Sequence, residues 1–107
     1  MTAILQSYAE DRWVAATEGL ADIASAIDGR VVARLSSRGL DFAAMVRHAR
    51  EVGGRALRRL TFHQRADMLK ALALYLSERK EPLYDLAADT GATKRDNLID
   101  IDGGLGT

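Results

Sequence analysis

Hydrophobic and polar residues alternate with helical spacing from residue 40 onward. Phe42, Met45, Val46 and Ala49 follow the i, i+3, i+4, i+7 pattern of one helix face, which predicts a helix that begins near Leu40. Asp41 lies near the positive end of its dipole, and Arg47, His48 and Arg50 lie toward the negative end. Gly53-Gly54 is predicted to end this helix, because glycine favours the left-handed conformation of a helix C-terminus.

The stretch from Leu60 to Gly91 carries the longest helical pattern in the chain. Thr61 and Gln64 have capping-box spacing at its start. An apolar stripe follows, made of Leu69, Leu72, Ala73 and Leu76 with Met68 and Tyr75 at its edge. Pro82, the chain's one proline, would break this helix but suits the first turn of a second helix. Gly91 is the expected left-handed cap of that second helix.

The residues after Gly91 have two competing interpretations. Thr93 with Asp96 resembles a helix start, and Leu98, Ile101 and Leu105 continue with helical spacing. The glycines in 102–107, however, are typical of a loose tail when this segment is considered by itself.

The first thirty-six residues favour strands. Ile4–Tyr8 and Arg12–Ala15 predict a first hairpin across Ala9-Glu10-Asp11, with Trp13 as its packing anchor. Ala21–Ile27 and Arg30–Ser36 predict a second hairpin.

Asp28-Gly29 lies between the two strands of this second hairpin and favours a tight primed turn with positive φ at both residues. The alternation of Val31, Ala33 and Leu35 predicts one buried face. A helical turn over the alanine-rich residues 21–26 is the competing interpretation.

Together these elements predict an α/β chain, α+β if it folds in isolation, with N-terminal β-hairpins followed by three to four helices. Its 107 residues make one small domain or part of a larger one, divided into strands over 1–36 and helices over 40–107. Fifteen basic residues balance fifteen acidic ones, which argues against nucleic-acid or membrane-surface partners. Without a signal peptide, a long apolar run or a cysteine, the expected location is the cytoplasm.

No catalytic constellation is evident in the spacing of the reactive residue types. His48 and His63 are too far apart for a helical metal pair. Gly103, Gly104 and Gly106 lack the order of a dinucleotide or nucleoside triphosphate loop. Residues 47–59 hold five arginines, which could bind phosphate, but the missing aromatic residues favour a solvated helix end.

Several segments together resemble the aldehyde dehydrogenase family, in its phenylacetate-degradation (PaaZ-type) branch. They are SSRGLD (36–41), ALRRLTF (56–62), RADMLKA (65–71), YDLAADTGAT (84–93) and IDIDGGLGT (99–107). The last segment, with its GG-x-GT ending, also resembles the related semialdehyde dehydrogenase of the benzoyl-CoA pathway. The resemblance covers residues 36–107 well and the first thirty-five more loosely, through Trp13 and Gly29.

This resemblance implies the N-terminal segment of an NAD(P)-dependent enzyme that oxidises a CoA-bound semialdehyde, with a partial cofactor-domain fold. The family uses a cysteine nucleophile and downstream cofactor motifs, so no catalytic or cofactor-binding residue is expected in this cysteine-free chain. By itself the chain should bind no cofactor. Its partner would be the remainder of the dehydrogenase domain or another copy, and the alternative is a non-catalytic interaction or oligomerisation domain.

Two structural features are also implied by the resemblance. Ile101–Thr107 would begin a long helix, whose glycines would let another element approach closely. Asp89, just before the TG turn, would hold a structural monovalent cation together with a peptide carbonyl near Ala24. From helix electrostatics alone, Asp89 is oddly placed at a negative helix end, where a cation, an arginine or a turn N–H would relieve it; plain solvent exposure is the favoured explanation, because the dipole penalty there is only about 0.3–1 kcal/mol.

Overall fold

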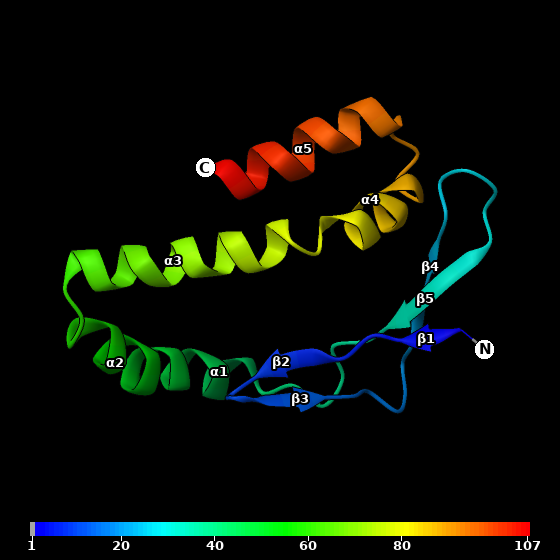
Figure 1. The fold of residues 1–107 in the computed structure, drawn as a ribbon. Helices are drawn as coiled ribbons and strands as arrows, with labels where there is room; N and C mark the ends of the chain where they lie inside the picture. The colour runs from blue at the N-terminus through cyan, green and yellow to red at the C-terminus, as the bar shows by residue number, and fades with distance from the viewer. Residues whose placement is uncertain (1) are drawn as a thin grey trace. The chain divides into compact units, whose positions relative to one another are not determined.

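The computed structural model describes residues 2–107, which form two compact units (Figure 1). The first unit holds residues 2–24 and 29–59, and the second holds residues 25–28 and 60–107. Strands precede helices along the chain, as expected for an α+β fold. The boundary between the units does not coincide with the change from strands to helices. The segment 25–28 belongs to the second unit, together with the helices of residues 60–107.

The first unit contains two small sheets. Its strands are β1 (Ala3–Ile4), β2 (Ser7–Ala9), β3 (Arg12–Val14), β4 (Ala21–Ala24) and β5 (Val31–Leu35). One sheet has the order β1-β5-β4, with β1 parallel and β4 antiparallel to β5, and the other sheet is the β2-β3 pair. The chain start therefore pairs with a strand thirty residues away, a contact that turn chemistry does not reveal.

The first hairpin is confirmed, but it is shorter than predicted. Ile4 lies in β1 and pairs with β5 instead of joining the hairpin. Glu10 and Asp11 connect β2 to β3 with φ values of 51° and 63°. Positive φ at both central residues is the primed geometry that matches the twist of the flanking strands.

The prediction that Trp13 anchors the packing of this hairpin is wrong. Its side chain is 68% exposed. Trp13 pairs across the strands with Tyr8, and the two rings meet edge to face at 5.1 Å. Because side chains alternate along a strand, both rings share the solvent-facing side, while Ala9 beside them is buried.

The second hairpin is also confirmed, but the predicted tight turn at Asp28-Gly29 is wrong. Ala24 pairs with Val31, so a six-residue loop connects β4 to β5, and within it Gly29 has the positive φ, 74°. The competing helical turn over residues 21–26 is absent, since β4 occupies most of it. Of the face predicted to be buried, Ala33 is buried, whereas Val31 and Leu35 remain exposed.

The helix predicted from Leu40 does not end at Gly53-Gly54. It runs as α1 (Phe42–His48), a wide π turn η1 (Ala49–Gly53) and α2 (Gly54–Arg58). Both glycines keep a right-handed φ of −61°, so neither acts as a stop. Asp41 begins the helix by accepting a hydrogen bond from the Ala44 backbone N–H at 2.9 Å.

The second unit is built from α3 (Phe62–Ser77), α4 (Lys80–Ala88) and α5 (Lys94–Gly106). Figure 1 shows α5 turning back to lie beside α3, which it also contacts. The capping box at Thr61 and Gln64 is confirmed in both of its hydrogen bonds. Pro82 lies in the first turn of α4, and Gly91 follows that helix with a φ of +83°, both as predicted.

The loose tail suggested by local composition is wrong, because α5 continues through the glycines to Gly106. Thr93 begins this helix by accepting from the Asp96 N–H at 3.2 Å. Apart from their chain neighbours and the nearby backbone of α5 itself, no atom of residues 2–107 lies within 4 Å of where a Cβ would stand on Gly103, Gly104 or Gly106. The close approach implied for these glycines is therefore not made by the part of the chain described here.

The buried core is small. Across residues 2–107 the buried apolar residues are Ala9, Ala16, Ala33 and Tyr84. Among the same residues, no helix has the length and apolar character needed to cross a bilayer.

Candidate functional site

Asp89 stands at the C-terminal end of α4, and two groups of the 25–28 segment bind it. The Ser25 hydroxyl donates to its Oδ1 at 2.8 Å, and the Ala26 N–H donates to its backbone carbonyl at 2.9 Å. Ser25 is only 3% exposed, so this contact lies inside the second unit. The expectation of plain solvent exposure at Asp89 is therefore wrong: a hydroxyl donates to the carboxylate, and a turn N–H donates to the backbone carbonyl of the same residue. Cation binding at Asp89 stays a prediction.

A second polar cluster joins α4 to α5 through Asp102. Its Oδ1 accepts from the Tyr84 hydroxyl at 2.6 Å and from the Lys80 ammonium at 3.2 Å. Lys80 and Tyr84 are one helical turn apart on α4, so both reach the same carboxylate. The cluster therefore fastens α5 to α4 at Asp102, directly before Gly103 and Gly104.

The same contacts shift the pKa of all three groups. The hydrogen bond from Tyr84, followed by that from Lys80, lowers the pKa of Asp102 below its ordinary value. The hydrogen bond to Asp102 raises the pKa of Tyr84 and that of Lys80. Tyr84 is thus held as the neutral donor and Lys80 as the cation. This is the opposite of what a tyrosine or lysine base needs, so the cluster serves structure better than proton abstraction.

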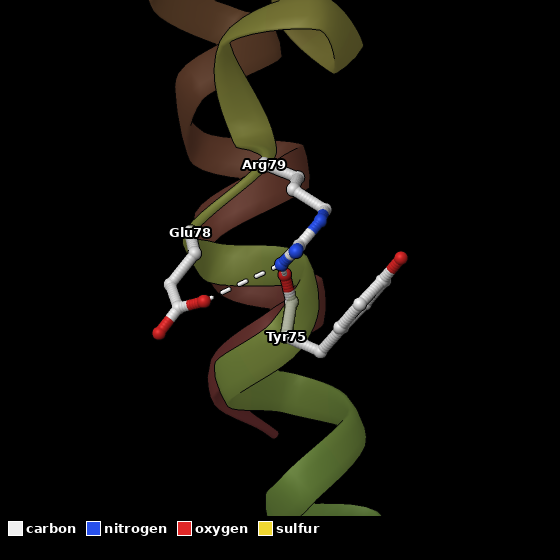
Figure 2. A network of polar contacts seen from close by, with 3 residues as sticks. All are labelled: Tyr75, Glu78 and Arg79. Atoms are coloured by element: carbon white, nitrogen blue, oxygen red, sulfur yellow. Dashed lines mark hydrogen bonds and ion pairs between the residues drawn. The ribbon is translucent and has the colours of Figure 1, made fainter.

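A third polar cluster lies at the C-terminal end of α3, just before α4 begins (Figure 2). The Arg79 guanidinium lies over the Tyr75 ring at 3.7 Å and donates to the Tyr75 carbonyl at 3.1 Å. It also pairs with the Glu78 carboxylate at 3.3 Å. A cation at the last carbonyls of a helix complements its dipole, so Arg79 caps α3. All three side chains are solvent-exposed.

The histidines and glycines form no reactive centre. His48 ends α1 in the first unit, and His63 lies in the first turn of α3 in the second. Residues 2–107 contain no group of three or more histidine, cysteine, aspartate or glutamate side chains placed to hold a metal ion. Gly103, Gly104 and Gly106 are helical, so their N–H groups do not form a phosphate loop.

One hollow of the second unit also lacks a catalytic set. It measures about 250 Å³ and is lined by Glu81, Tyr84, Asp85, Ala88, Ala92, Lys94 and Asn97. The Tyr84 hydroxyl is already committed to Asp102, and the charged groups are exposed. The five arginines of residues 47–59 are likewise exposed, in agreement with a solvated helix end.

Sequence reasoning missed Ser25 and Asp102, whose side chains make hydrogen bonds to residues far along the chain. Ser25 lay in a segment interpreted as strand, and Asp102 in one interpreted as tail. The spacing of Lys80 and Tyr84 was a usable signal for Asp102, since an i, i+4 pair of a cation and a phenol can share one carboxylate. Nothing local marks Ser25, because its partner is 64 residues away.

Comparison with known proteins adds one relationship. No protein-family model matches the chain. Over 104 residues, 96% of its length, the chain is 33% identical to the 3,4-dehydroadipyl-CoA semialdehyde dehydrogenase of Aromatoleum evansii. The chain spans 20% of that protein. This similarity supports an origin related to the aldehyde dehydrogenases.

Proposed function

We propose that the chain is the N-terminal part of an NAD(P)-dependent aldehyde dehydrogenase. The enzyme would resemble the one that oxidises a CoA-bound semialdehyde in aerobic phenylacetate degradation. The observation that carries this proposal is the 33% identity with a CoA-semialdehyde dehydrogenase along nearly the whole chain. The relative's name identifies a CoA-bound semialdehyde as its substrate, and the proposal extends that substrate class to the enzyme of which this chain is a part.

Within that enzyme the chain acts as a scaffold. It contains no cysteine, so the nucleophile comes from the remaining sequence. The exposed apolar face of α3, formed by Phe62, Met68, Leu69 and Leu72, is the surface that the rest of the domain covers. Burial of apolar surface stabilises a fold by about 25 cal/mol per Å². The internal core of this chain is small, so covering this face would add stabilisation that the core alone does not provide.

A chimaera tests the proposal. The matching fifth of the Aromatoleum evansii enzyme is replaced by this chain, and reduction of NAD⁺ or NADP⁺ is measured with the CoA-bound semialdehyde of that enzyme. We expect an active, folded chimaera, because the apolar face regains its partner. A soluble, folded chimaera without activity would contradict the proposal.

A matched pair of variants in the chimaera reports on the scaffold face. Leu69→Asp places a carboxylate where the domain is expected to close, and an unpaired buried charge should abolish folding or reduce activity at least about tenfold. Asp67→Lys, on the opposite side of α3, should leave activity nearly unchanged. Equal effects of the two substitutions would show that this face of α3 remains in solvent.

The alternative is a non-catalytic interaction or oligomerisation domain. The same exposed apolar residues favour it, since patches of this kind mark protein contacts. Light scattering on the isolated chain distinguishes the two functions when combined with the chimaera. A stable oligomer that Leu69→Asp converts to a monomer, together with an inactive chimaera, favours the alternative.

A further inference from the structure

At the C-terminal end of α4, negative charge is compensated by hydrogen-bond donors from the 25–28 segment. Asp89 adds a carboxylate to a helix terminus that already carries partial negative charge from unpaired carbonyls. Such a site is relieved either by a bound cation or by hydrogen-bond donors. The structure shows hydrogen-bond donors at this helix end.

Two oxygens of Asp89 accept hydrogen bonds from the 25–28 segment. The Ile27 N–H donates to the Ser25 Oγ at 3.2 Å, and the Ser25 hydroxyl in turn donates to the Asp89 Oδ1 at 2.8 Å. The Asp89 carbonyl accepts the Ala26 N–H at 2.9 Å. Each link of this chain polarises the next, which strengthens a hydrogen bond to an ionised acceptor. These donors place positive partial charge beside the Asp89 oxygens without a bound cation.

The packing beside the network is equally specific. Gly91 has a φ of +83°, and a Cβ placed there would lie 3.1 Å from the Ala26 Cβ. A glycine at 91 therefore lets the 25–28 segment lie close to the turn that follows α4. Ser25, buried at 3% exposure, is then held with its hydroxyl toward Asp89.

We propose that Ser25 takes the place of a structural cation: its hydroxyl compensates the Asp89 carboxylate and fastens the 25–28 segment to the end of α4. The stability of this protein is then independent of potassium and sodium. Extending the conclusion to a complete dehydrogenase rests on the proposed function, but the contacts themselves lie within this chain.

Thermal unfolding of the chain in potassium, sodium and choline chloride at matched ionic strength tests the proposal. We expect the same midpoint in all three salts. Ser25→Ala should lower the midpoint by about 5 °C or more, as expected for losing a hydrogen bond to a charged acceptor. Ser37→Ala, at an exposed serine, is the control and should change it little. A midpoint raised saturably by potassium or sodium but not choline would overturn the proposal, as would an unaffected Ser25→Ala variant.

Carbon-13 NMR of the Asp89 carboxyl in the unsubstituted chain keeps the test decisive if Ser25→Ala fails to fold. Titration with potassium chloride should leave its chemical shift, and the amide shifts of Ala26 and Ile27, equal to those in choline chloride. A saturable, potassium-specific shift would overturn the proposal. That outcome leaves the dehydrogenase assignment intact, whereas an inactive chimaera would remove the assignment and leave these contacts standing.

Discussion

The two hairpins of this chain have turns of opposite kinds. Glu10-Asp11 contains no glycine, yet both residues adopt positive φ and close β2 onto β3 directly. Asp28-Gly29 has the composition of a tight turn, yet it lies within a six-residue loop. The difference lies in the partners of each segment. The Tyr8 hydroxyl bonds to Asp11 three residues away, whereas Ser25 and Ala26 bond to Asp89.

This comparison shows that turn chemistry decides a hairpin only when no distant partner competes for the loop. Replacing a tight primed turn by a six-residue loop costs little free energy, because the entropy of loop closure depends only weakly on loop length. Two hydrogen bonds to Asp89, one of them charge-assisted, outweigh that gain. The loop is therefore set by the helices of the second unit, and the first hairpin by its own residues.

Among the changes considered, two glycine substitutions should lower the free energy of unfolding the most. Gly91→Ala forces a side chain into positive φ and against Ala26, so we expect a loss of about 2–4 kcal/mol in the free energy of unfolding. Gly29→Ala has the same φ problem but open space around it, and should cost about 1–2 kcal/mol. Urea unfolding measures both. Equal losses would mean that the 25–28 segment is not packed against Gly91.

Acid and alkali should weaken the second unit through the Asp102 cluster. The pKa of Asp102 is lowered from 3.8 by the Tyr84 hydroxyl, so its contribution is complete above that pH and is lost as the pH falls through the lowered value. The pKa values of Tyr84 and Lys80 are raised from 10.0 and 10.5. Their contributions are complete below those values and are lost as the pH rises through the raised ones.

Unfolding midpoints measured across pH check this expectation. Tyr84→Phe should flatten the dependence at both ends, because it removes the hydroxyl that shifts Asp102. Tyr75→Phe is the control, since the Tyr75 hydroxyl makes no hydrogen bond within residues 2–107. An unchanged pH profile in Tyr84→Phe would contradict the assigned role of this hydroxyl.

The smallest effect is expected in the first hairpin. Glu10→Gly removes the cost of a side chain at positive φ and should raise the free energy of unfolding by up to about 1 kcal/mol. Glu10→Ala keeps the strain and should give no such gain. Urea unfolding again provides the measurement, and a gain with alanine equal to that with glycine would show that φ is not the cause.

Much of the fold could be predicted where the relevant contacts are local. The capping box at Thr61, the helix start at Thr93 and the Gly91 stop all depend on groups within four residues. The candidate site was predicted less well. Asp89 was selected, but Ser25 and Asp102 acquire their roles from partners far along the chain.

The sequence by itself determined where α3, α4 and α5 begin and that two hairpins precede the helices, because caps, proline and strand alternation act within a few residues. Only the tertiary structure decided the loop at 25–30, the exposure of Trp13 and the partners of Asp89. It also decided that the helix passes through Gly53-Gly54 in a π turn instead of stopping. The loop and the partners of Asp89 depend on hydrogen bonds between residues more than sixty positions apart, which no local pattern in the sequence reveals.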